Sequence, residues 1–220
     1  MKQDYTHLTV ILDRSGSMEP IRDDTIGGFN TFLKQQQAEP GTATLTLVQF
    51  DSQDPYEVIH GFEAIGKVPP LTRETFVPRG STPLLDALGQ GINDLERTIA
   101  QTTEDARPSK VIFVVVTDGL ENASREFSRD QIQRMIKEKT ESNNWQFVFL
   151  SADLAALGDA RSVGISHESS LLFEKSGQGS AAAWNATSAR TSDYRSNRKS
   201  KMEFDDEDRK HPDDPEKPKS

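Results

Sequence analysis

LTVILDRSGS, residues 8–17, is the stretch of sequence that decides the fold. Its first five residues are apolar or β-branched, which is typical of a strand covered on both faces, as in a parallel sheet. Asp13 follows this strand directly, and Ser15 and Ser17 follow at alternate positions. Open α/β folds bind their ligands in the loops that leave the carboxyl ends of their strands. The stretch therefore predicts an α/β fold with a ligand site immediately after an early strand.

Further strands are predicted by other runs of apolar and β-branched residues. The clearest runs are residues 111–116 and 145–150, followed by residues 44–50. Residues 56–62 and 170–173 are weaker candidates, the second of them short. Each run ends near polar or turn-forming residues, as strands of a central sheet do.

Between these strands, apolar residues spaced three and four positions apart predict amphipathic helices. Ser128 and Asp153 stand where the N-caps of two of them are expected. Strands that alternate with helices imply βαβ crossovers, so we predict a doubly wound, mostly parallel central sheet flanked by helices on both faces. The predicted helices cover residues 26–33, 84–99, 132–136, 154–157 and 177–195.

The length of 220 residues suits one domain with an appendage, and we place the domain at residues 1–196. Residues 197–220 carry seven basic and eight acidic residues and three prolines. Only Met202 and Phe204 are large and apolar there, too few to offset the entropy cost of ordering. We therefore predict that residues 197–220 form a disordered, charged tail.

The composition excludes several classes of function. A net charge of −9 repels the phosphate backbone that supplies most nucleic-acid affinity, so no nucleic-acid partner is expected. The chain has no cysteine, which excludes disulfides and thiolate zinc sites and favours a cytoplasmic protein. Its apolar runs are far shorter than a membrane-spanning helix needs, and its first residues do not resemble a secretory leader. No membrane partner is expected either.

Two carboxylates are predicted to converge with hydroxyl groups at one edge of the sheet. Asp118 follows the strand at 111–116, so it meets Asp13 if the two strands are parallel. A bound cation is the simplest way to keep both carboxylates ionised. Ser15, Ser17 and Thr82 offer neutral oxygens, and hard oxygen donors favour Mg²⁺, Mn²⁺ or Ca²⁺ over zinc or copper. Magnesium is the default choice inside a cell.

These residues form three motifs that resemble a known metal site. They are Asp13-x-Ser15-x-Ser17, Thr82 within Gly80-x-Thr82-Pro83, and Thr117-Asp118-Gly119 after an apolar strand. Together they resemble the metal-ion-dependent adhesion site of von Willebrand factor A domains, over roughly residues 1–195. The resemblance implies a Rossmann-like fold in which the serines and the threonine coordinate the metal directly or through water, while the aspartates complete or support the shell. The chain looks most similar to soluble bacterial and phage-borne members, including those associated with tellurite resistance.

Simpler explanations exist for each residue taken alone. Asp13 and Ser15 could cap the first helix, Thr82 could cap the second, and Asp118 could stabilise a turn. Arg14 is predicted to be a solvated loop residue, and Glu121 an exposed loop acid. Residues 61–68 have the spacing of a phosphate-binding loop but lack its Ser or Thr, and two prolines follow at once.

The predicted function is metal-dependent protein binding without catalysis, in which an Asp or Glu of a protein partner completes the coordination of the cation. The resemblance implies partners such as AAA+ ATPases or kinases in a bacterial or phage assembly. The alternative is a Mg²⁺-dependent phosphohydrolase, because Mg²⁺ beside two carboxylates can activate water. That chemistry usually needs a positioned general acid or base, and the loops offer no nearby His. A third possibility is a structural domain whose site holds no metal.

Overall fold

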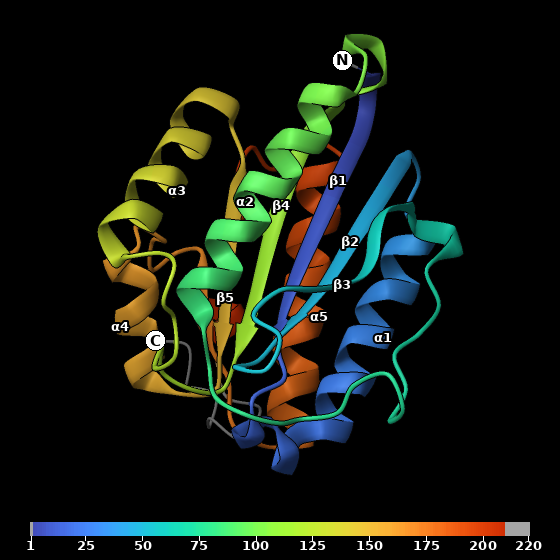
Figure 1. Ribbon diagram of the computed structural model, residues 1–220. Helices are drawn as coiled ribbons and strands as arrows, with labels where there is room; N and C mark the ends of the chain where they lie inside the picture. Colours follow the sequence, from blue (N-terminus) through green and yellow to red (C-terminus); the bar gives the residue numbers. More distant parts are fainter. Residues whose placement is uncertain (1, 210–220) are drawn as a thin grey trace, which may run out of the picture.

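A central six-stranded sheet organises the computed structural model, which describes residues 2–209 (Figure 1). The strand order is β3-β2-β1-β4-β5-β6, and every neighbouring pair is parallel except β2 with β3. This confirms the predicted mostly parallel, doubly wound α/β fold. The strands are β1 Lys2–Asp13, β2 Thr42–Phe50, β3 Glu57–Ala64, β4 Pro108–Thr117, β5 Gln146–Ser151 and β6 Ser170–Leu172.

Five helices cover the two faces of the sheet. Helices α1 and α5 pack on one face, and α2, α3 and α4 on the other. Along β1, Leu8 and Val10 enter the first core while Ile11 enters the second, which explains the unbroken apolar run in the sequence. The helices are α1 Arg22–Ala38, α2 Leu84–Gln101, α3 Arg129–Asn143, α4 Leu154–Ser162 and α5 Gly177–Arg195.

Local signals set several helix boundaries as predicted. Ser128 forms a capping box at the start of α3 with Gln131, and the Asp153 side chain accepts a hydrogen bond from the backbone N–H of Ala155 at the start of α4. These caps satisfy N–H groups that have no partner inside the helix.

Close packing between α1 and α5 joins distant parts of the chain. Trp184 of α5 lies against Phe29 and Phe32 of α1. A Cβ atom at Gly28 would lie only 2.6 Å from the Nε1 atom of Trp184, so the indole occupies the space that a side chain would need. Gly28 therefore fixes the distance between the two helices.

The prediction of a disordered tail is wrong for residues 197–209. Met202 is 1% exposed and Phe204 6% exposed, and both join the core beside α5. Arg190 of α5 forms ion pairs with Asp205 and Asp208. Two apolar anchors and paired charges thus order a segment whose overall composition resembles that of a disordered chain. The rest of the predicted tail, residues 210–220, lies outside the described residues.

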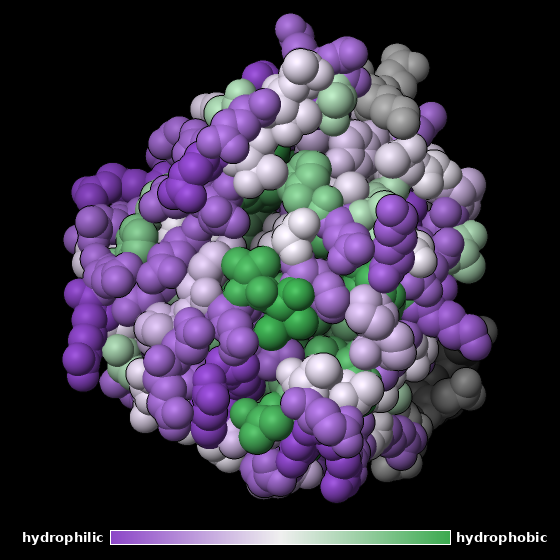
Figure 2. Space-filling model, turned by 45° about the vertical axis from the view of Figure 1, so that its right-hand side comes forward, coloured by the Kyte–Doolittle hydropathy of each residue, from purple (hydrophilic) through white to green (hydrophobic). Residues whose placement is uncertain are grey.

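The face in Figure 2 is largely hydrophilic, with small apolar groups between polar ones. Within the described part of the chain, no helix combines the length and the apolar character that a membrane crossing requires. Residues 61–68 lie in the edge strand β3 and the short turn after it, so the resemblance to a phosphate-binding loop has no structural counterpart.

Candidate metal centre

Asp13 and Thr117 are the last residues of the neighbouring parallel strands β1 and β4. The Asp13 carboxylate is fully buried and accepts hydrogen bonds from the Thr117 hydroxyl (Oγ1 to Oδ2, 2.6 Å) and from the backbone N–H of Ser15 (N to Oδ1, 2.6 Å). Burial raises the pKa of Asp13 to about 6, although these hydrogen bonds lower it, and the nearby charge of Asp118 adds to the rise. Asp13 therefore holds the serine loop against the end of β4.

Two serine hydroxyls and the second carboxylate form a short chain of oxygen atoms above Asp13. The Ser15 and Ser17 Oγ atoms are 3.0 Å apart, and the Ser17 hydroxyl donates to Asp118 Oδ1 at 2.6 Å. Ser15 and Asp118 are buried, whereas Ser17 is exposed. The oxygens therefore lie at the boundary between the interior and the solvent, at the carboxyl edge of the sheet.

Thr82 reaches the same place from the loop before α2. A Cβ atom at Gly119 would lie 3.5 Å from Ser17 Oγ and 3.8 Å from Thr82 Oγ1, so both hydroxyls border the small space above this glycine. The backbone N–H of Thr82 donates to Asn122 Oδ1 at 3.0 Å, which joins this loop to the one after β4. All five predicted ligands thus come from three adjoining loops.

The alternative in which Thr82 caps the second helix is not realised in the structure. Helix α2 begins at Leu84, and its N-cap position is held by Pro83, whose side chain has no group that could accept a hydrogen bond. Instead the Glu121 carboxylate accepts from the backbone N–H of Leu85 (Oε2, 3.0 Å) and from the N–H groups of its own loop. Glu121 is half-buried, so it is not the exposed loop acid that we expected. Its capping role leaves Thr82 to face the loops of the candidate site.

Arg14 is also not the solvated residue predicted, because it is buried between the loops. Its Nε atom donates to Asp51 Oδ2 at 2.6 Å, and Arg79 Nε donates to the same oxygen at 2.9 Å. Burial alone would raise the pKa of the fully buried Asp51, but the hydrogen bonds from Arg79 and Arg14 hold it below its usual value. The Arg14 carbonyl also accepts from the Arg79 N–H at 2.7 Å, and the Gly16 N–H donates to the Gly80 carbonyl at 3.0 Å. Asp51 therefore joins the serine loop to the threonine loop.

Besides Asp51, the motifs also did not predict Lys175, which contacts the candidate ligand Asp118. It lies between β6 and α5, and its Nζ atom is 3.1 Å from Asp118 Oδ2. Nothing in the linear sequence around this lysine distinguishes it from other surface lysines. Asp51 carries a weak signal, because it too directly follows a buried strand that neighbours β1.

Comparison with solved structures identifies the fold. A von Willebrand factor type A protein from Catenulispora acidiphila is 12% identical, with a TM-score of 0.57 over 87% of this chain and 43% of that one. The pilus adhesin SpaC from Lactobacillus rhamnosus GG is 14% identical, with a TM-score of 0.63 over 87% and 30%. Manganese-loaded TRAP protein from Plasmodium vivax is 15% identical, with a TM-score of 0.59 over 86% and 72%. The chain has a von Willebrand factor A-like fold.

This von Willebrand factor A-like chain spans less than half the length of the first two of these proteins. At such low identity the likeness shows the fold alone. No family model matches the sequence, and no curated protein sequence matches it.

Three of the five candidate ligands, Ser15, Ser17 and Thr82, carry hydroxyl groups. Within residues 2–209 there is no cluster of three or more His, Cys, Asp or Glu side chains that could hold a metal. Here the neutral hydroxyl oxygens of Ser15, Ser17 and Thr82 supplement two carboxylates, those of Asp13 and Asp118. Such a set fits a hard divalent cation with a coordination position left for another ligand.

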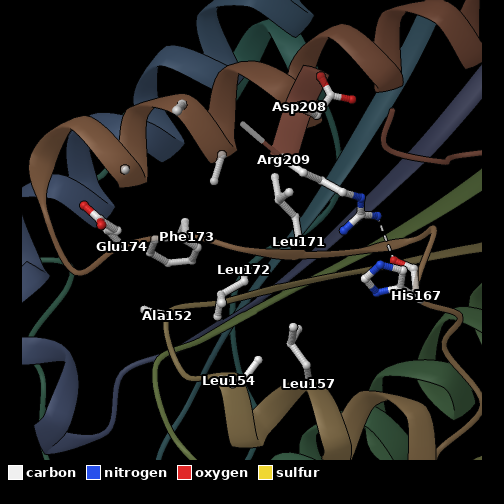
Figure 3. A pocket seen from close by; sticks show the side chains of 13 residues that line it. Ala152, Leu154, Leu157, His167, Leu171, Leu172, Phe173, Glu174, Asp208 and Arg209 are labelled. Atoms are coloured by element: carbon white, nitrogen blue, oxygen red, sulfur yellow. Dashed lines mark hydrogen bonds between the residues drawn. The ribbon is translucent and has the colours of Figure 1, made fainter. Parts of the chain in front are cut away.

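A separate groove of about 640 Å³ lies between α4, β6, α5 and the C-terminal segment (Figure 3). Its walls are mainly apolar, with Leu157, Leu171 and Phe173 among the lining residues. Arg209 closes one end and donates to the His167 carbonyl (Nη2 to O, 2.8 Å). The groove contains none of the five predicted ligands, so the candidate chemistry lies outside it.

Proposed function

We propose that this von Willebrand factor A-like domain binds a protein partner through a divalent cation. Ser15, Ser17 and Thr82 would supply neutral oxygens, and Asp13 and Asp118 would complete or support the shell. An Asp or Glu of the partner would occupy the remaining coordination position. The proposed cation is Mg²⁺, with Mn²⁺ or Ca²⁺ as chemically similar alternatives. The domain would perform no catalysis itself.

The observation that carries this proposal is the row of oxygens from Ser15 through Ser17 to Asp118, with separations of 3.0 and 2.6 Å. These atoms come from two loops that are 101 residues apart in sequence, and the outermost hydroxyl is exposed. A cation there would have buried oxygen ligands beneath it and access to solvent above it. The manganese-loaded state of the similar TRAP protein supports the choice of a divalent metal.

Neutral ligands are central to the proposed mode of binding. Hydroxyl oxygens leave more of the charge of a cation uncompensated than carboxylates would, so an additional anionic ligand is favoured. A partner carboxylate suits this position better than an amide, which is a poorer ligand for a hard cation. From the resemblance of the motifs, we place such a partner in a cytoplasmic bacterial or phage assembly that contains, for example, an AAA+ ATPase or a kinase.

Metal binding is tested by calorimetric titration of the chain with Mn²⁺ and Mg²⁺. Wild type should bind one equivalent, while Ser17→Ala and Asp118→Ala should bind much more weakly. Ser109→Ala is the matched control, because its hydroxyl bonds to the Tyr5 carbonyl at the opposite end of β4. Equal binding by all four proteins would exclude a cation at the proposed site.

The partner chemistry is tested with a random peptide display library selected in Mg²⁺, with Asp118→Ala as the counter-selection. Enriched peptides should contain Asp or Glu, lose binding in excess chelator and lose binding when that residue is changed to Asn or Gln. Enrichment that is indifferent to chelator would contradict the proposal. Mg²⁺-dependent turnover of a phosphoester that is lost in Asp118→Ala would instead favour the phosphohydrolase alternative.

A further inference from the structure

Asp118 is shared between the oxygens of the candidate site and a lysine from a distant part of the fold. Its Oδ1 atom accepts from Ser17 at 2.6 Å, while its Oδ2 atom lies 3.1 Å from Lys175 Nζ. The Asp118 side chain is fully buried, whereas that of Lys175 is 45% exposed. The chain therefore places a cation of its own on the same carboxylate that a divalent metal would use.

Two cations that share one carboxylate weaken the binding of each other. Both are attracted to the negative charge of Asp118, but they also repel one another, and this repulsion is strong where one wall of the site is buried. The thermodynamic coupling is reciprocal, so a lysine that disfavours the metal is itself displaced or destabilised by the metal. We propose that Lys175 is a tethered counter-cation that competes with the divalent metal for Asp118 and thereby sets the metal affinity of the site.

This inference rests on the proposed function, because it requires a divalent cation at Asp118. The position of Lys175 suits the role. Its flexible four-carbon side chain and partial exposure allow the ammonium to move into water at modest cost. The lysine directly precedes Ser176, which caps α5 by accepting from the N–H of Gly179 at 3.1 Å. Movement of the lysine side chain alone leaves this cap intact.

The experiment compares metal affinity with stability in three variants of the full chain. Lys175→Met keeps much of the length of the side chain but removes its charge, and Lys175→Arg retains the charge. Lys139→Met is the matched control, because Lys139 also pairs with carboxylates, at 2.6 Å from Glu96 Oε1, but lies on α3. The dissociation constants for Mn²⁺ and Mg²⁺ are measured by calorimetry at a temperature where every variant is folded.

Lys175→Met should bind the metals about fivefold more tightly than wild type, the factor expected from the loss of a half-exposed ion pair. Its melting temperature without metal should fall, because the Asp118 carboxylate loses its counter-charge, and saturating metal should restore it. Lys175→Arg should keep the wild-type affinity. Lys139→Met should lower the melting temperature without changing the affinity for metal.

The sign of the effect separates this role from a merely structural one. If the lysine only shapes the site, its removal should leave metal affinity unchanged or weaken it. Either result, in an experiment where wild type binds metal, would overturn the inference while leaving the proposed function intact. A complete lack of metal binding by both wild type and Lys175→Met would overturn the proposed function as well. Metal binding by Lys175→Met but not by wild type would support strong competition between the lysine and the metal.

Discussion

Asp51→Asn should both destabilise the fold and weaken the proposed metal site. The Asp51 carboxylate is fully buried and accepts from Arg14, Arg79 and the N–H groups of Gln53 and Asp54. The amide of asparagine is neutral, and it can accept at only one of the two positions where the carboxylate accepts. The substitution therefore leaves the buried Arg14 guanidinium without its fully buried counter-charge.

The expected magnitude follows from the surroundings of Arg14. Breaking a buried ion pair by removing one partner costs about 3–5 kcal/mol. Arg14 would retain a pair with the half-exposed Glu57 and a weak hydrogen bond to Gln49 (Nη1 to Oε1, 3.3 Å), so we expect a value near the lower end, about 3 kcal/mol. Its second terminal nitrogen, Nη2, is buried with no partner among the described residues, which adds to the sensitivity of this position.

Denaturant unfolding measures the loss of stability, and calorimetric titration with Mn²⁺ below the melting temperature measures the site. We expect metal affinity to fall about tenfold, which corresponds to about 1.4 kcal/mol, because the serine loop and the threonine loop lose the carboxylate that joins them. Asp23→Asn, which removes an exposed partner of Arg73, should change neither quantity measurably. Gly28→Ala should lower stability but leave metal affinity unchanged. Wild-type stability and affinity in Asp51→Asn would refute the proposed coupling of the two loops.

Three further predictions concern the core and the C-terminal segment. Burial lowers the pKa of His7 from 6.5 to about 3, so the folded protein keeps this imidazole neutral at pH 7 and at pH 5. The unfolded chain takes up a proton at His7 as the pH falls below 6.5, which favours unfolding. The unfolding free energy should therefore drop by about 2 kcal/mol more in wild type than in His7→Gln between pH 7 and 5, and parallel pH profiles would contradict this. Gly28→Ala should cost about 3 kcal/mol in denaturant unfolding by forcing the tryptophan of α5 away, whereas the control Gly27→Ala, with open space at its Cβ position, should be neutral or slightly stabilising. Phe204→Ala should also cost about 3 kcal/mol, and an unchanged denaturation midpoint would mean that residues 197–209 contribute no core.

The strands could be predicted because each one carries its signal locally. A parallel sheet covered on both faces requires unbroken apolar runs, and β1 and β4 show them. The order of strands and helices then restricted the topology. The candidate ligands were predictable for the same reason, because Asp13, Ser15 and Ser17 follow one such strand within five residues.

Residues 197–209 could not be predicted because composition averages over a whole segment. Its charges are nearly balanced and its apolar residues few, which resembles a disordered chain. What orders it is the specific placement of Met202 and Phe204 in the core and of two aspartates opposite Arg190. These partners are remote in sequence but adjacent in space, so only the tertiary structure reveals them.

The same limit applies to the residues that surround the candidate ligands. The sequence predicts Arg14 as a polar loop residue, yet the fold buries it against Asp51, 37 positions away in sequence. Lys175 meets Asp118 across 57 positions. A short motif can specify which atoms bind a cation, because ligand spacing is local. The charges that tune such a site come from any loop that reaches the same edge of the sheet.

The charges at this edge also bear on why a metal and a partner would bind together. The hydroxyl-rich ligand set would leave part of the charge of a divalent cation uncompensated, and the ammonium of Lys175 beside Asp118 would add to this excess positive charge. A carboxylate from the proposed partner would remove that excess. By linkage, the partner would raise the affinity for metal by the same factor as the metal would raise the affinity for the partner. A lysine that weakens the binding of metal alone would thereby make occupancy of the site depend more strongly on the presence of an acidic partner.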